Sequence, residues 1–402
     1  MKILHLCGGS LNGGAAKGMI SLHHALIELG INSKILIQYG NKSKNVSSLS
    51  SNFLKRVKQL VLNHSNNLYL LKYKKKQIFS APFFGNKITK TKEYKWADVI
   101  HIHWLNNSLI SLEELSKIDK PIIWTLRDMW PFTGGCHYTN GCQKYKNKCG
   151  KCPLLSSNFD NDLSHTFFLK KEKLYPKFNA VAISNWIKSE AEKSSLTKDV
   201  IMISNCINTK KFNPYDKIKS KKELGIPANK KNILLGATNI LDAYKGVSQF
   251  KNSLKYFDKN KYFFTFFGNK ITKPLDELNI NYKHFGNINS EGLLSMLYSS
   301  ADVFVAPSIQ EAFGKTLVES MSCETPVVCF DATGPKDIVK HKKTGYKAKP
   351  FDSKDLANGI EWVLTNNRNN ILGKNARKDV IERFDSKVIA KKYIELYKKV
   401  LN

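Results

Sequence analysis

The chain has 402 residues with 42% hydrophobic content, and its 64 Lys and Arg outnumber its 33 Asp and Glu, which leaves a formal net charge of +31. This length exceeds one ordinary hydrophobic core, so two domains are expected. The opening MKILHLCGG is too short an apolar run for a signal peptide, and no later run approaches the roughly 18 apolar residues of a membrane span. A cytosolic or peripheral protein is therefore expected, and the positive charge favours anionic partners. Nucleic acid is not expected among them, because the lysines are scattered and no basic-aromatic recognition motif is present.

The N-terminal segment has the pattern of a Rossmann-like opening. Residues 3–7 form an apolar strand, GGSLNGGA follows as a glycine-rich turn, and an amphipathic helix ends at Gly30 before a second strand at 35–37. Glycines at 8, 9, 13 and 14 do not form the GxGxxG dinucleotide signature, which disfavours an NAD-binding interpretation.

A basic segment follows at residues 53–76. Phe53, Val57, Leu60 and Val61 recur at helical spacing, and the segment contains no acidic residue. Two interpretations are open: a surface that docks on anionic lipid headgroups, and an amphipathic helix packed on its own domain with a solvated basic face. The seven cations of the segment are Lys55, Arg56, Lys58, Lys72, Lys74, Lys75 and Lys76.

Two near-continuous apolar runs, DVIHIHW at 98–104 and PIIWTL at 121–126, are typical of buried parallel strands. Alternate residues of a strand point to opposite faces, so at least one of His101 and His103 is expected to be packed. Ligands of open α/β sheets bind beyond the carboxyl ends of the strands, so the polar residues there are candidates for the acceptor side of a site. These residues are His103, Asn107, Arg127 and Asp128.

Four cysteines lie within seventeen residues at the spacing C-x5-C-x6-C-x2-C: Cys136, Cys142, Cys149 and Cys152. Four thiolates in one loop suit a tetrahedral structural zinc site, with His137 as a spare nitrogen donor. Free thiols and disulfides are the alternatives, and a cytosolic location argues against disulfides. The other four cysteines lie in apolar or boundary contexts and are expected to be core thiols.

A change in composition separates the two halves of the chain. A strand at 180–183 and another at 200–203 complete the first half, and a polar, basic stretch with Pro214, Gly225 and Pro227 follows them. The expected division is an N-terminal domain at 1–205 with a Cys-rich loop at 134–153, a linker at 206–230, a C-terminal domain at 231–385 and a final helix at 386–402.

The stretch 301–330 predicts a strand, a helix and a strand, with apolar runs at 303–306 and 327–330 around a helix that opens near Gly314. The amides of the first helical turn carry the positive end of the helix dipole and suit a diphosphate, which a glycine lets approach the backbone. The residues of this opening are Phe313, Gly314, Lys315 and Thr316.

Two carboxylates flank this helix opening. Glu319 lies about 7 Å further along the helix axis, at about 1.5 Å per residue, which suits the ribose diol of a nucleotide. Glu311, on the other side, is expected to face sugar hydroxyls. Lys245, in the loop after a strand at 232–236, can neutralise diphosphate charge, and Gly286 closes a further strand.

The sequences PSIQEAFGKTLVESMSCETPVV, GPKDIV and KKTGYKAKPFDSKDLA resemble the donor-binding block of family 4 glycosyltransferases. The segment WTLRDMWPFTGGCHY, with the cysteines after it, resembles an insertion in a subgroup of these enzymes linked to bacterial surface polysaccharide synthesis. The resemblance implies the α/β GT-B fold, with two Rossmann-like doubly wound domains facing a central cleft and the final helix crossing back to the N-terminal domain. It also implies retaining transfer, and places Gly13 and Gly14 close to the donor phosphate. No catalytic divalent metal is expected, because neither nucleotide-facing loop contains an Asp-x-Asp pair.

The chain departs from the family pattern at two places. Many members carry a His-Asp pair after the second apolar run, where this chain has Arg127 and Asp128. The family usually has an Arg early in the loop after the strand at 232–236, where this chain has Ala237 and Thr238. Neutralisation of the leaving group is therefore expected to depend more heavily on Lys245 and Lys315.

The expected function is retaining transfer of a hexose from a UDP- or GDP-sugar to a glycan or lipid-linked oligosaccharide, in exopolysaccharide, capsule or O-antigen lipopolysaccharide synthesis. Glu311 and Lys245 are its candidate catalytic residues. No catalytic cofactor is expected, and structural zinc is a candidate. The expected location is the cytoplasm or the inner face of the plasma membrane, as a peripheral protein. The alternatives are a GT-B sugar-nucleotide epimerase and a non-catalytic basic nucleic-acid or lipid-binding protein.

Overall fold

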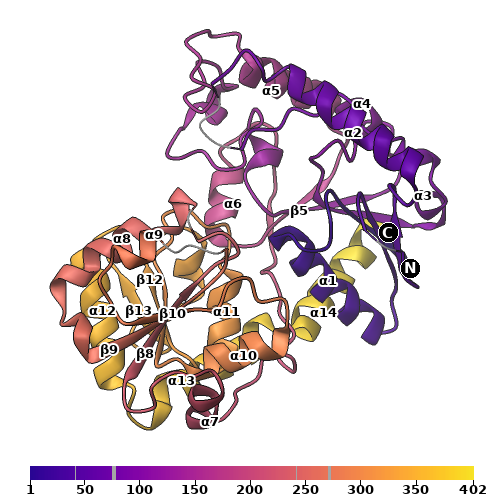
Figure 1. The fold of residues 1–402 in the computed structure, drawn as a ribbon. Helices are drawn as coiled ribbons and strands as arrows, with labels where there is room; N and C mark the ends of the chain where they lie inside the picture. Colours follow the sequence, from indigo (N-terminus) through magenta and orange to yellow (C-terminus); the bar gives the residue numbers. More distant parts are fainter. Residues whose placement is uncertain (41, 75–77, 241, 270–272) are drawn as a thin grey trace. The chain divides into compact units, whose positions relative to one another are not determined.

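The structure, a computed structural model, describes residues 1–40, 42–74, 78–240, 242–269 and 273–402 (Figure 1). The chain divides into two compact units. Unit 1 comprises Met1–Ser204 and Ile389–Asn402, and unit 2 comprises Asn205–Val388. Each unit is an α/β structure built on one sheet whose named strands all pair in parallel, which confirms the predicted Rossmann-like fold class.

The sheet of unit 1 has the strand order β3-β2-β1-β4-β5-β6-β7. Its central strands are buried along nearly their whole length, as expected where both faces of a parallel sheet are covered. The strands are β1 (Lys2–Cys7), β2 (Asn32–Ile37), β3 (Val46–Ser48), β4 (Val99–Trp104), β5 (Ile122–Leu126), β6 (Asn179–Ala182) and β7 (Ile201–Met202). The helices are α1 (Gly14–Glu28), α2 (Phe53–Leu68), α3 (Lys92–Trp96), α4 (Leu112–Leu115), α5 (Leu163–Leu174) and α6 (Asn185–Ala191).

The sheet of unit 2 has the order β10-β9-β8-β11-β12-β13. Its core is rich in aromatic and β-branched side chains such as Phe264, Phe266 and Val305. The strands are β8 (Lys231–Gly236), β9 (Tyr262–Phe267), β10 (Tyr282–His284), β11 (Val303–Ala306), β12 (Val327–Phe330) and β13 (Gly345–Ala348). The helices are α7 (Lys217–Glu223), α8 (Val247–Ser253), α9 (Lys273–Asp276), α10 (Glu291–Ser300), α11 (Lys315–Ser322), α12 (Ser353–Asn366) and α13 (Ile371–Phe384).

The last helix, α14 (Ser386–Leu401), begins in unit 2 and continues in unit 1. The Tyr397 hydroxyl lies 2.6 Å from His101 Nδ1, and the Tyr393 hydroxyl lies 2.8 Å from Thr125 Oγ1. These contacts attach the C-terminal part of the helix to β4 and β5 of unit 1.

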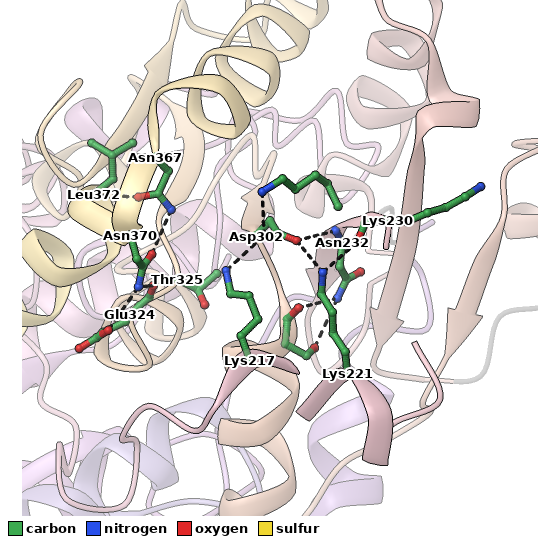
Figure 2. A network of polar contacts seen from close by, with 12 residues as sticks. Lys217, Lys221, Lys230, Asn232, Asp302, Glu324, Thr325, Asn367, Asn370 and Leu372 are labelled. Atoms are coloured by element: carbon green, nitrogen blue, oxygen red, sulfur yellow. Dashed lines mark hydrogen bonds and ion pairs between the residues drawn. The ribbon is translucent and has the colours of Figure 1, made fainter. Parts of the chain in front are cut away.

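Residues 206–230, predicted as a linker, belong to unit 2 and contain α7. Figure 2 shows why this basic segment is ordered. Lys217 Nζ and Lys221 Nζ lie 3.2 and 3.0 Å from the two carboxylate oxygens of Asp302, and the backbone N–H of Asn232 donates to the same carboxylate at 2.9 Å. The lysines that suggested a solvated linker instead fasten α7 to the start of β11.

Helix α2 presents apolar side chains to solvent. Phe53 and Leu54 are each 77% exposed, and Leu60 is 65% exposed. The helix contacts its own unit through polar residues instead: Gln59 Nε2 donates to the Asn107 carbonyl at 3.2 Å, and Asn66 Nδ2 donates to Ser108 Oγ at 2.7 Å. The interpretation of α2 as a helix that packs its apolar face on its own domain is therefore wrong. Lys75 and Lys76 of the basic segment lie outside the described residues.

Among the described residues, no helix combines the length and apolar character needed to span a bilayer.

Candidate functional site

The predicted strand–helix–strand unit is present, with β11 and β12 at the predicted positions and α11 beginning directly after Gly314. Gly314 has φ of 109°, a conformation that favours glycine, and it forms the N-cap of α11. The Leu317 N–H donates to the Gly314 carbonyl at 3.1 Å. The N–H groups that precede it at the opening of α11 are of the kind that has no intrahelical partner, so they can donate to an anion. Phe313 contributes only its backbone here, because its side chain is buried and packs edge-on against Phe384 with ring centroids 5.7 Å apart.

A cavity lies at the carboxyl ends of β8 and β11, which are neighbours in the sheet of unit 2. Polar side chains line it from two segments of the chain: Lys245 follows β8, and Ser308, Glu311 and Thr316 lie on the stretch that runs from β11 into α11. Its apolar wall includes Ile240 and Val247. The topology thus brings together two segments from which the sequence predicted donor-binding residues.

Lys245 and Glu311 form an ion pair in this cavity, from Nζ to Oε2. Both side chains are about one-fifth exposed, at 20% and 19%. The sequence predicted that Lys245 contacts a diphosphate and that Glu311 contacts a sugar, whereas in the structure the two side chains pair with each other.

Gly246, which sequence reasoning missed, makes this pairing possible. Its φ is 74°, and a Cβ at this position would lie 1.8 Å from the Pro307 carbonyl oxygen at the end of β11. The backbone N–H of Ile309 donates to the Tyr244 carbonyl at 2.8 Å in the same contact. A side chain at position 246 would push the two loops apart and separate Lys245 from Glu311. The sequence signal was the glycine directly after Lys245.

Glu319 is buried and already hydrogen-bonded within unit 2. Lys315 Nζ lies 2.6 Å from Oε1, and the Tyr298 hydroxyl donates to Oε2 at 3.0 Å. Burial, followed by the charge of Glu319, raises the pKa of Tyr298 well above its ordinary value, so its hydroxyl remains a donor. Each carboxylate oxygen retains acceptor capacity after one such bond. Tyr298 is a positioning residue that sequence reasoning did not identify.

Of the predicted residues of unit 1, His103 lies within β4 near its carboxyl end, and Asn107, Arg127 and Asp128 follow the ends of β4 and β5. His103 Nδ1 accepts from Arg127 at 2.9 Å, and His103 Nε2 lies 2.9 Å from His5 Nδ1. His101 and His103 are both buried, at 0% and 1% exposure, so the expectation that at least one is packed is confirmed.

Three buried histidines form a cluster in unit 1: His5, His101 and His103. Among the described residues, this is the one group of three possible metal ligands whose ligand atoms all lie within 4.8 Å of one another. Burial, followed by neighbouring positive groups that include Arg127, lowers the pKa of each well below its ordinary value. His101 uses both ring nitrogens, toward Tyr397 and Thr125. Neutral rings that bond to one another and to hydroxyls beside a guanidinium form a polar core network and do not suit a cation.

Asp128 is held by three donors: Trp104 Nε1 at 3.1 Å, the Trp130 backbone N–H at 2.9 Å and His137 Nδ1 at 2.6 Å. His137 Nε2 lies 2.9 Å from Ser80 Oγ, so both nitrogens of this ring have partners. The interpretation of His137 as a spare zinc donor is therefore wrong, because the ring bridges Asp128 and Ser80.

The remaining predicted residues are backbone features or exposed side chains. Gly13 and Gly14 begin α1 and leave open space where a Cβ would stand. Gly286 has φ of 64°, and its carbonyl accepts from the Gly268 backbone N–H at 2.8 Å. Asn107 is exposed, and its carbonyl accepts from Gln38 and Gln59. The four cysteines of the 134–153 loop line a single cavity in unit 1.

Known proteins match the part of the chain that contains this cavity. Residues 216–379 match the family model described as glycosyl transferases group 1. An uncharacterized glycosyltransferase of Methanocaldococcus jannaschii is 25% identical over 347 residues, which cover 80% of this chain and 87% of that protein. The N,N'-diacetylbacillosaminyl-diphospho-undecaprenol alpha-1,3-N-acetylgalactosaminyltransferase of Campylobacter jejuni is 31% identical over 48% of this chain and 53% of its own length. The crystal structure of Anabaena HepE in complex with UDP-glucose has the same fold, with a TM-score of 0.69 at 16% identity over 99% of this chain and 100% of that one.

Proposed function

We propose that this glycosyltransferase, whose residues 216–379 match the family model of the glycosyl transferases group 1, transfers a hexose from a UDP- or GDP-sugar with retention of configuration. The proposed acceptor is a glycan or lipid-linked oligosaccharide of a bacterial surface polysaccharide. The diphospho-undecaprenol in the name of the Campylobacter jejuni relative supports a lipid-linked acceptor, and the UDP-glucose bound to Anabaena HepE supports a nucleotide-sugar donor.

The observation that carries the proposal is the Lys245–Glu311 ion pair beside the opening of α11. A diphosphate at the first-turn amides brings two negative charges next to Lys245, and these compete with Glu311 for the ammonium group. Lys245 then turns to the leaving phosphate, and the released Glu311 carboxylate accepts from sugar hydroxyls. Donor binding thus exchanges an internal ion pair for two ligand contacts.

This arrangement needs no carboxylate pair that acts as nucleophile and base, unlike a retaining glycoside hydrolase. In same-face attack, the acceptor oxygen bonds to the anomeric carbon as the phosphate oxygen leaves, and the departing phosphate oxygen takes the acceptor proton. The protein contributes positioning and stabilisation of the charge that develops on the phosphate, from Lys245, Lys315 and the α11 amides. Glu319 is assigned to the ribose diol.

The test separates sugar transfer from nucleotide binding. Glu311→Gln is expected to lower sugar turnover by about 100-fold, as loss of a positioned polar contact does, while calorimetry finds UDP or GDP affinity within about twofold of wild type. Glu277→Gln, at an exposed ion pair with Lys251 elsewhere in unit 2, is the matched control. Unchanged turnover in Glu311→Gln would contradict the assignment of Glu311 to the sugar hydroxyls. Donor incubated alone must remain unepimerised, since an epimerised product would support the alternative enzyme class.

We further propose that unit 1 docks on an anionic membrane through α2. Its apolar residues are solvent-exposed, with Phe53, Leu54, Leu60 and Val61 between 59% and 77% exposed. Cations accompany them at Lys55, Arg56 and Lys58, and the segment carries no acid. Apolar insertion combined with attraction to acidic headgroups is the usual mode of an interfacial helix.

Vesicle co-sedimentation tests this docking. Phosphatidylglycerol vesicles should bind the protein and phosphatidylcholine vesicles should not, and added salt should weaken binding. Leu60→Ser together with Phe53→Ser should lower binding at least tenfold, whereas Ile218→Ser, at a 71% exposed apolar position of unit 2, should not. Equal binding by the α2 variant would contradict the proposal.

A further inference from the structure

The sulfur atoms of the Cys-rich loop have no role in the transfer proposed above. Cys136, Cys142, Cys149 and Cys152 are all free thiols, and they line one cavity together with Phe79, Tyr145 and Leu154. Cys136 and Cys152 are buried, and the other two are half-buried. Thiols that converge from two separated pairs of positions on one largely apolar cavity form a donor set that suits a soft, borderline cation.

The loop that carries these cysteines has little regular structure of its own. Within the described residues, only the short 3-10 helix Lys144–Asn147 lies between Thr133 and Asp162. The C-x2-C segment turns through successive positive φ angles: 62° at Cys149, 99° at Gly150 and 42° at Lys151. Loops of this length without secondary structure of their own are uncommon inside a compact unit and are usually functional or disordered.

A buried lysine holds the start of the loop. Lys171 is fully buried, and its Nζ donates to the carbonyls of Trp130 and Thr133. These hydrogen bonds fix the chain just before Cys136, but they do not reach the segment that carries the other three cysteines.

We propose that Cys136, Cys142, Cys149 and Cys152 together bind one structural Zn²⁺ ion. Each thiol loses its proton and forms a Zn–S bond, so that one Zn²⁺ displaces four protons and no electron is transferred. Among the described residues, no three of the four sulfurs lie within 4.8 Å of one another. A closed site would therefore draw the sulfurs together around the ion and fix the turn at Cys149–Cys152.

The site is structural because all four positions are protein thiolates, which leaves no open position for a substrate. Gly134 and Gly150 form part of the cavity wall where larger residues would not fit. A Cβ on Gly134 would lie 3.0 Å from Cys149 Sγ, and one on Gly150 would lie 2.3 Å from the Asp160 carbonyl oxygen. The metal would thus fasten the loop to the segment that leads into α5.

Elemental analysis of the full-length wild-type protein, purified without chelator and under reducing conditions, is the primary test. We expect about one zinc per chain, and X-ray absorption should show four sulfur neighbours at about 2.3 Å. Zinc added to chelator-treated protein should release about four protons per ion. Absence of zinc both after purification and after add-back overturns the proposal, as does intact mass spectrometry that finds two disulfides in these cysteines.

Variants locate the site. Cys149→Ser and Cys142→Ser should each lower zinc content at least tenfold, whereas Cys206→Ser, at a buried thiol of unit 2, should leave it unchanged. If a loop variant fails to fold, Co²⁺ substitution in the wild type still decides the question, since a tetrahedral four-thiolate site gives intense visible absorption. A spectrum of octahedral Co²⁺ would contradict the proposal.

Discussion

A carboxylate is paired with lysine near each end of β11, but the two carboxylates differ in how accessible they are. At its start, Asp302 is surrounded by Lys217, Lys221 and Lys231 at 3.0 to 3.6 Å. Beyond its other end, Glu311 pairs with Lys245 in a cavity. The first carboxylate is 9% exposed and the second is 19% exposed.

The difference lies in how completely each carboxylate is satisfied. Asp302 also accepts the backbone N–H of Asn232, so it is enclosed by cations and by the sheet (Figure 2). Glu311 and Lys245 each have room for a further partner from the cavity. An enclosed ion cluster in which every group has its partners stabilises the fold. An ion pair that remains accessible from a cavity can instead exchange its internal partner for a ligand.

The largest effect is expected from Asp302→Asn. The substitution leaves the 6% exposed Lys221 ammonium without its counter-ion, so the free energy of unfolding should fall by about 3–5 kcal/mol. Urea denaturation measures it, and Asp258→Asn, at an exposed pair with Lys261, is the control, with a change of less than about 1 kcal/mol. Equal effects of the two substitutions would remove the distinction between the ends of β11.

The pH dependence sharpens the same contrast. Burial alone would raise the pKa of Asp302, but Lys217 and Lys221 outweigh it, and the pKa lies below its ordinary value of 3.8. A carboxyl group with a lowered folded-state pKa stabilises the fold above its unfolded pKa, and this contribution is lost as the pH falls through the folded pKa. The stability difference between wild type and Asp302→Asn should therefore be constant above about pH 5 and shrink below about pH 4. A difference that grows on acidification would contradict this sign.

The next largest effect is expected at the Lys245–Glu311 ion pair beyond the carboxyl end of β11. Lys245→Met should weaken UDP or GDP binding by about 10- to 100-fold, the contribution of a charge-assisted contact, with little change in the free energy of unfolding. Isothermal titration and urea denaturation on the same samples measure both quantities. Lys251→Met is the control for loss of a lysine in this unit. A loss of stability comparable to that of Asp302→Asn would make Lys245 a structural residue.

A smaller change is expected for Glu319→Ala. Loss of the diol contacts should raise the donor KM by about 5- to 10-fold, the contribution of one or two hydrogen bonds. Tyr298→Phe keeps the carboxylate and removes only its 3.0 Å donor, so its KM should rise less. Initial rates at varied donor concentration measure both, and an unchanged KM in Glu319→Ala would end the ribose assignment.

The smallest effect on the free energy of unfolding is expected from Lys231→Ala, beside Asp302 at the start of β11. Lys231 is 58% exposed and lies 3.6 Å from Asp302, so solvent screens the pair and the stability should change by less than about 1 kcal/mol. A larger loss, measured by urea denaturation, would mean that all three lysines act as one unit.

The sequence predicted what depends on local pattern. The runs at 303–306 and 327–330 are the observed strands, because buried parallel strands read as continuous apolar segments. The helix opening after Gly314 followed from the same logic.

Contacts between distant segments could not be predicted in this way. Tyr298 reaches Glu319, and Lys221 reaches Asp302 eighty-one residues away, only because the sheet order places their elements together. The lysines of α7 therefore suggested a linker, and His137 suggested a free ligand. The amphipathic spacing in α2 predicted a helix, but spacing alone does not say which face meets the domain.

The route of the chain through α14 has a consequence for how the protein is made. Unit 1 is completed by residues 389–402, which follow all of unit 2 in the order of synthesis. During translation, the contacts of His101 with Tyr397 and of Thr125 with Tyr393 can form only after all of unit 2 has been synthesised. Unit 2 can therefore fold as one piece, whereas unit 1 is completed only when α14 packs on β4 and β5.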